Sequence, residues 1–147
     1  MKRIILTVVA SCALCFAGYQ WHKSIQEKRI FVQDIKSRTD QYGFLDISDN
    51  LPESKGIVIV APVNCPSQQA KIADYLVTEL NKQNIPATRT NGYNFSQNLT
   101  NMSKREINQM VKRIEYVRTM APPQVFVNGK IKSNPSLEDI KKEWELQ

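Results

Sequence analysis

The sequence predicts a mixed α/β domain that follows an apolar N-terminal segment. Two observations carry the fold class. An unbroken β-branched run, "GIVIVAPV", leads into a segment with one apolar helical stripe and then into a second strand-like segment, "NIPATRT". Further along, "QVFV" and "KIK" flank an Asn-Gly pair, which is typical of a tight hairpin turn. Because a strand–helix–strand succession favours parallel pairing through a right-handed crossover, we expect a mixed sheet.

Length and charge limit the class of protein. A chain of 147 residues holds one domain of ordinary size together with an anchor and a short stalk. The formal net charge is +6, of which Lys2, Arg3 and Lys23 supply three charges near the N-terminus. There is no basic stripe with interleaved aromatic residues, so nucleic-acid binding is not expected. One histidine, His22, and one thiol in the body do not make a metal site, so we expect no metal.

Residues 1–23 are expected to be an export signal. After a basic start, the sixteen residues 4–19 contain only two polar interruptions. As a helix this run measures roughly 24 Å, a little less than the ~30 Å hydrocarbon core of a membrane. An uncleaved anchor flanked by Trp21, cleavage after Ala17 and lipid attachment at Cys12 all stay open. We expect a single-pass protein of the cell membrane with its domain facing the periplasm; the alternative is secretion to the periplasm after signal cleavage.

Residues 24–41 are expected to form a helical stalk or linker, because apolar side chains from Ile25 to Ile35 recur at near-helical spacing. The turn-rich stretch "DQYGFLDISDNLPESKG" then marks the start of the domain proper, residues 42–147, with a short strand around 44–47. We expect the β-branched run that follows this stretch to form a strand buried on both faces.

Three helices are expected within the domain. Capping boxes predict where two of them start, one from Ser103 with Glu106 and the other from Ser136 with Asp139. The side chains expected to face the core from the three helices are Ala73, Leu76, Val77 and Leu80; Ile107, Met110, Val111, Ile114 and Val117; and Leu137, Ile140 and Trp144. The acidic residues expected on the surface of the last helix are Glu138, Asp139, Glu143 and Glu145.

The element order strand, helix, strand, helix, strand, strand, helix resembles the thioredoxin fold, and the closer likeness is to glutaredoxins. The stretch "VNCPSQQA" resembles their C-P-x-C opening, and "PPQVFVNGKI" resembles their V-P-Q-V-F-I-N-G segment. The likeness covers roughly residues 56–144. It implies a thioredoxin-like β-α-β-α-β-β-α domain with a central mixed sheet. It also implies that Pro123 is a cis proline lying against the active cysteine, Cys65.

Cys65 is the candidate catalytic residue, and its position supplies the chemistry. We expect it at the N-cap of the first helix of the domain, where free backbone N–H groups and the positive end of the helix dipole favour thiolate and lower the thiol pKa. Pro66 suits the first helical turn, which needs no N–H. Because thiolate is the attacking species in disulfide exchange, Cys65 is predicted to be a nucleophile. The alternative is an inert buried cysteine.

Several departures from the glutaredoxin pattern limit what the resemblance implies. Gln68 stands where a resolving cysteine would be, so exchange must be monothiol. Pro122 lacks the backbone N–H that usually receives the bound peptide or glutathione. Ser133 and Asn134 replace a glycine pair that helps to hold glutathione. These departures argue against glutathione as a bound cofactor, and we expect no cofactor. The predicted substrate-binding residues are Pro66, Pro122 and Pro123.

Three functions follow as alternatives. The first is monothiol disulfide exchange with protein thiols or disulfides in the cell envelope. The second is a catalytically inactive binding or scaffold module of an envelope or transfer complex, which the missing second cysteine and the missing donor at Pro122 favour. The third is an intermolecular disulfide through Cys65 that would join two copies covalently.

Overall fold

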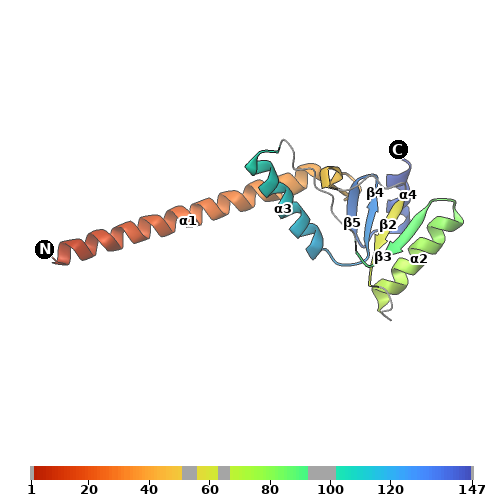
Figure 1. Ribbon diagram of the computed structural model, residues 1–147, viewed down its shortest axis with the longest axis horizontal. Coiled ribbons are helices and arrows are strands. Elements are labelled where there is room, and N and C mark those ends of the chain that lie inside the picture. Colours follow the sequence, from red (N-terminus) through yellow and green to blue (C-terminus); the bar gives the residue numbers. More distant parts are fainter. Residues whose placement is uncertain (1, 51–55, 63–66, 93–101, 147) are drawn as a thin grey trace. The chain divides into compact units, whose positions relative to one another are not determined.

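The computed structural model describes residues 2–50, 56–62, 67–92 and 102–146. The chain divides into two compact units, Met1–Ser37 and Arg38–Gln147. The first unit is helical, and the second holds the sheet and the other helices (Figure 1). The fold is mixed α/β, as the sequence predicts.

The N-terminal unit consists of one helix. α1 (Lys2–Arg38) runs without a break through both the apolar segment and the predicted stalk. Its side chains Phe16, Tyr19 and Trp21 are exposed. Among the described residues, none of the helices combines the length and the apolar character needed to cross a membrane.

In the second unit, the described strands form one mixed sheet in the order β1-β5-β4-β2-β3. They are β1 (Leu45–Asp46), β2 (Ile57–Val60), β3 (Ala87–Thr90), β4 (Gln124–Val127) and β5 (Lys130–Ser133). β2 and β3 are parallel, which confirms the predicted crossover, and the other neighbouring pairs are antiparallel. β1 confirms the short strand expected near residues 44–47. β3 begins later than expected because Asn84 takes a left-handed conformation after α2.

Three helices and a short 3₁₀ turn complete this unit: η1 (Ser48–Asn50), α2 (Gln68–Lys82), α3 (Lys104–Thr119) and α4 (Leu137–Trp144). α2 and α4 contact each other and the strands on one face of the sheet, whereas α3 lies on the other side (Figure 1). Both predicted capping boxes are present at α3 and α4.

The main core lies where α2 and α4 cover the sheet. Its buried side chains are Phe44, Ile57, Ile59, Ala61, Ala73, Leu76, Leu80, Ala87, Val125, Val127 and Ile140. Leu137 and Trp144 pack against this core, as predicted. Val58 and Val60 are only partly buried, so the prediction of a strand buried on both faces is wrong. Neighbouring residues of a strand point to opposite faces, and α2 and α4 seal only one of them.

The β4–β5 hairpin turns through Asn128 and Gly129, which both have positive φ, as the Asn-Gly pair predicts. A Cβ on Gly129 would lie 2.9 Å from the Cβ of Ser48, so glycine is required here by backbone conformation and by space. The carbonyl of Gly129 accepts a hydrogen bond from the N–H of Ile47 at 3.0 Å. The hairpin turn therefore holds the segment between β1 and η1.

Two predicted side-chain positions are wrong, that of Val111 facing the core and that of Glu143 on the surface. Val111 is exposed and Arg113 is buried on α3. Val111 lies about 100° around the helix from Met110, at the edge of the stripe. Glu143, expected on the surface of α4, is buried and forms an ion pair with Lys130. Burial of a charged group requires a partner, and this partner comes from the hairpin rather than from the helix itself.

Candidate functional site

Three chain segments meet at one end of the sheet: the end of β2, the end of β3 and the start of β4. Val60 of β2 pairs with Gln124 of β4, and the N–H of Ala61 donates to the carbonyl of Thr90 at 3.1 Å. The connection from β2 to α2, which carries Cys65, leaves from this end. Loops at the carboxyl ends of parallel strands are where α/β proteins place their sites.

The segment before β4 contains a cis peptide bond between Pro122 and Pro123, which confirms the predicted cis proline. Pro123 is buried and Pro122 is half-buried. The carbonyl of Pro123 accepts a hydrogen bond from the N–H of Asn134 at 2.7 Å. Asn134 has a φ of 48°, a conformation that glycine or asparagine adopts most readily. Residues after β5 thus hold the double proline beside the end of β2.

The predicted nucleophile Cys65 and the neighbouring Pro66 lie outside the described residues. The start of α2 is described, and it differs from the prediction. Ser67 is the N-cap residue, and its hydroxyl accepts a hydrogen bond from the N–H of Ala70 at 3.3 Å. A serine oxygen is a better acceptor than a thiol, so the helix begins two residues later than the N-cap position predicted for Cys65.

Gln124 was missed as a structural residue of this site. Its side-chain amide is buried and donates to the carbonyl of Val117 at 3.1 Å and to that of Met120 at 2.6 Å. These carbonyls belong to the C-terminal end of α3, where the last carbonyls lack the regular intrahelical donors, although the Val117 carbonyl also accepts a hydrogen bond from the N–H of Met120 at 3.1 Å. Gln124 therefore ties the end of α3 to β4 on either side of the double proline. A polar residue directly after Pro122 and Pro123 in an otherwise apolar strand was the available signal.

Arg89 is the second residue that the sequence reasoning missed. It lies opposite Ile59 in the β2–β3 pair, on the face that α2 covers. Its guanidinium donates to the carboxylate of Asp74 on α2 and to the carbonyl of Pro62, where the connection carrying Cys65 begins. The Arg89 side chain is 16% exposed, so its charge is partly shielded from water. This places a positive charge and an orienting hydrogen bond at the start of that connection.

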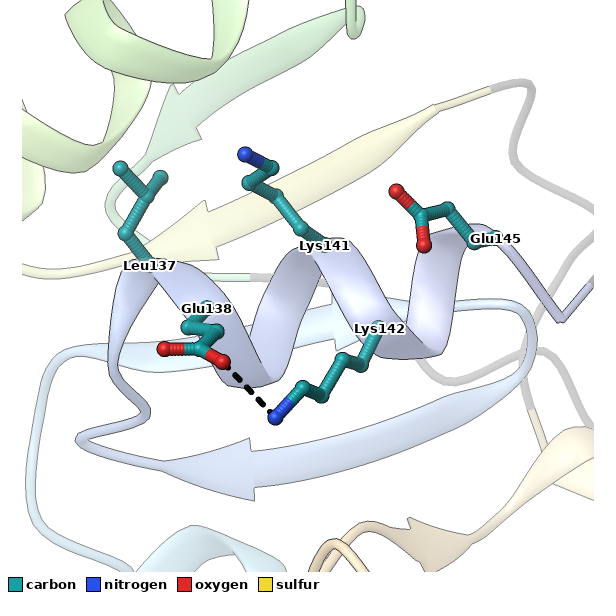
Figure 2. Close-up of a pocket in the computed structure, with 5 residues that line it drawn as sticks. All are labelled: Leu137, Glu138, Lys141, Lys142 and Glu145. Carbon is teal, nitrogen blue, oxygen red and sulfur yellow. Dashed lines mark ion pairs between the residues drawn. The ribbon is translucent and has the colours of Figure 1, made fainter.

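A surface hollow of about 450 Å³ lies along α4, away from these residues. Its lining residues are Leu137, Glu138, Lys141, Lys142 and Glu145. Figure 2 shows Glu138 directed toward Lys142, with which it forms an ion pair at 2.8 Å. All five residues belong to one helix face, and none of them belongs to the predicted site. The hollow offers exposed charges and no convergent polar groups, so it is not the functional site.

Comparisons of the chain with protein-family models, curated proteins and solved structures found no match. Within the described ranges, no three His, Cys, Asp or Glu side chains are grouped so that they could hold a metal ion. The arrangement at the sheet end therefore has to be interpreted from its own chemistry.

Proposed function

We propose that residues 42–147 form a thioredoxin-like domain that performs monothiol disulfide exchange through Cys65. One observation carries the proposal: Val60 pairs with Gln124 directly after the cis Pro122–Pro123 bond. The buried Pro123 thus lies beside the end of the strand that leads to Cys65. A lone cysteine would not support this function, but a cysteine on the connection that follows a strand whose end lies beside the buried Pro123 does.

The strand order adds support. Apart from β1, the sheet has the order β5-β4-β2-β3, with β2 and β3 parallel and β4 antiparallel to both of its neighbours. α2 connects the parallel pair, and α4 follows the hairpin. This order and these connections support the thioredoxin-like topology that we propose.

The exchange proceeds in two balanced steps. The Cys65 thiolate attacks one sulfur of a substrate disulfide, forms a mixed disulfide and expels the other sulfur as a thiolate, which takes up a proton. Because Gln68 stands in place of a resolving cysteine, an external thiol must then attack the mixed disulfide. That attack restores the Cys65 thiolate, and the external thiol and the bound sulfur form a new disulfide. The external thiols supply the two electrons.

Activation of Cys65 has two sources in this arrangement. The N-terminus of α2, capped by Ser67, directs backbone N–H groups toward the preceding connection. The Arg89 guanidinium adds a positive charge at Pro62. Pro123 shapes the substrate groove, and Pro122, having no N–H, leaves the substrate backbone without one donor.

A binding or scaffold module is the rival, and the same two positions favour it. Pro122 cannot donate to a bound peptide, and Gln68, the first residue of α2, is exposed and cannot resolve a mixed disulfide. A domain of this kind would bind an envelope protein without turnover.

Turnover separates the two functions. The full-length chain with Cys12→Ala and Cys15→Ala, in detergent, has Cys65 as its only thiol. We expect it to accelerate reduction of a disulfide-linked fluorescent peptide by an added small thiol, in proportion to protein concentration. Cys65→Ser in the same background is the matched control and should give the rate without protein. Equal rates for both proteins would reject exchange and leave the scaffold.

The proposed tether and the covalent dimer have their own readouts. If the N-terminal segment anchors the chain in the cell membrane, the full-length protein stays in the membrane pellet after an alkaline wash. Release together with a mass that begins after Ala17 would instead mean a cleaved signal and a periplasmic protein. On non-reducing gels, a band of twice the mass that Cys65→Ser abolishes would identify the intermolecular disulfide.

A further inference from the structure

Two hydrogen bonds from the end of β5 hold the segment that leads into β4. The hydroxyl of Ser133 donates to the carbonyl of Ala121 at 2.6 Å. The N–H of Asn134 donates to the carbonyl of Pro123 at 2.7 Å. The two carbonyls that accept these bonds stand on either side of Pro122 in the chain. We call these two hydrogen bonds the proline clamp.

The register of the sheet explains why the clamp comes from these residues. Ser133, the last residue of β5, pairs with Gln124, the first residue of β4. Beyond this pair, Pro122 and Pro123 have no N–H with which to continue a regular ladder. The strands can then stay in contact only through donors on the β5 side. The hydroxyl of Ser133 and the backbone of the next residue supply them.

The carbonyl of Pro122 differs from its two neighbours. Within the described residues, no donor reaches it. A proline ring fixes φ at about −65°, so ψ is the main backbone freedom left in this segment. Because the clamp anchors the carbonyls before and after Pro122, it also restricts the direction of the carbonyl between them. Pro122 is half-buried, so a ligand can reach part of this residue.

We propose that Ser133 is a positioning residue of the exchange site. Through Ala121 it holds the Pro122 carbonyl where this carbonyl accepts a hydrogen bond from a backbone N–H of the substrate. Pro122 cannot donate in return, so the contact selects substrates that carry amide N–H groups. The substrate class is therefore a peptide or protein disulfide rather than a small disulfide without amides. This inference rests on the exchange function proposed above.

Two disulfides of different chemistry separate positioning from a general effect on the thiol. The reference protein is the full-length chain with Cys12→Ala and Cys15→Ala in detergent, and intact mass follows the formation of a mixed disulfide at Cys65. The probes are the disulfide-linked fluorescent peptide and hydroxyethyl disulfide, which has no amide. Ser133→Ala should slow the reaction with the peptide by about three- to tenfold, the effect of one hydrogen bond, and leave the reaction with hydroxyethyl disulfide unchanged.

Two further variants serve as controls. Ser133→Thr keeps the hydroxyl and should restore the rate with the peptide. Ser37→Ala is the matched control, because the hydroxyl of Ser37 also donates to a backbone carbonyl, that of Asp34 at 2.9 Å. It should leave both rates unchanged.

A change in the substrate removes the same contact from the other side. In a second peptide, an ester oxygen replaces the amide N–H of the cysteine in the disulfide. The reference protein should react with this ester peptide about three- to tenfold more slowly than with the amide peptide. In Ser133→Ala the difference between the two peptides should shrink, because the Pro122 carbonyl is no longer held in place.

The contrary outcomes distinguish this inference from the function on which it rests. Equal effects of Ser133→Ala on both disulfides, no rescue by Ser133→Thr, or equal rates for the amide and ester peptides would overturn the positioning role and leave the exchange intact. A reference protein that forms a mixed disulfide with neither probe would reject the exchange and the inference with it. The ester comparison uses the reference protein alone, so it decides even if Ser133→Ala does not fold.

Discussion

At the scale of single residues, Arg89 links the chemistry of the proposed site to its framework. Its guanidinium reaches from β3 to the Asp74 carboxylate and to the carbonyl of Pro62, three residues before Cys65 in the sequence. Three residues of chain span at most about 10 Å, a range over which an incompletely screened charge still shifts a thiol pKa.

Substitutions of Arg89 and Asp74 are predicted to shift the thiol pKa in opposite directions. Arg89→Gln removes a positive charge and should raise the Cys65 pKa by a few tenths to about one unit. Asp74→Asn removes the opposing negative charge and should lower it by less, because Asp74 is mostly exposed. The readout is the pH profile of alkylation in the background without Cys12 and Cys15. A shift of the thiol pKa in the same direction for both variants would mean that the Arg89–Asp74 pair affects Cys65 only by fixing the backbone at Pro62, and not through its charges.

The sequence predicted the conformation of a residue where neighbouring residues determine it. It did not predict the burial of a residue whose partner lies on another element. The cis bond at Pro123 and the positive φ of Gly129 follow from motifs that contain those residues. The buried Glu143 does not, because its partner Lys130 belongs to another element, the β4–β5 hairpin. Cys65 was expected at the N-cap because of Pro66, whereas Ser67 offers the stronger acceptor.

At the scale of elements, the link between α3 and β4 sets the position of the double proline. The side-chain amide of Gln124 is buried and donates hydrogen bonds to the carbonyls of Val117 and Met120. Leaving buried carbonyls without donors costs free energy, so this amide is part of the framework of the site.

Gln124→Ala is predicted to lower the free energy of unfolding by about 1–3 kcal/mol, because it removes a hydrogen bond to the Met120 carbonyl and a second one to the buried Val117 carbonyl. Urea denaturation of the full-length chain in mild detergent measures this change. Thr119→Ala is the matched control, since Thr119 is exposed and its hydroxyl donates to the carbonyl of Tyr116 within α3; it should change stability by less than about 0.5 kcal/mol. Similar losses for the two variants would contradict the role assigned to Gln124.

Most helices and strands could be predicted, because the motifs that start or end them are made of a few neighbouring residues. The Ser103 and Ser136 capping boxes and the hairpin turn each depend on four neighbouring residues, and all are present. Val111 shows the limit of periodicity, because a residue at the edge of a helical stripe is placed by what packs beside it. On the same helix, Arg113 takes a buried place that hydrophobic patterning assigns to apolar residues.

At the scale of the whole molecule, contacts between distant segments decided what the sequence could not. β1 pairs with β5, and Lys130 binds Asp40 across 90 residues of sequence. No local pattern indicates such a contact. The mixed α/β class and the parallel pairing of β2 with β3 could be predicted; the supporting side chains Arg89 and Gln124 could not.

The central claim is that Cys65 is an activated thiol at this end of the sheet. The rate of Cys65 alkylation as a function of pH, in the full-length chain with Cys12→Ala and Cys15→Ala, tests it most directly. We predict a thiol pKa clearly below the free value of about 8.5, with substantial reaction already at neutral pH. A pKa at or above about 8.5 would contradict the claim.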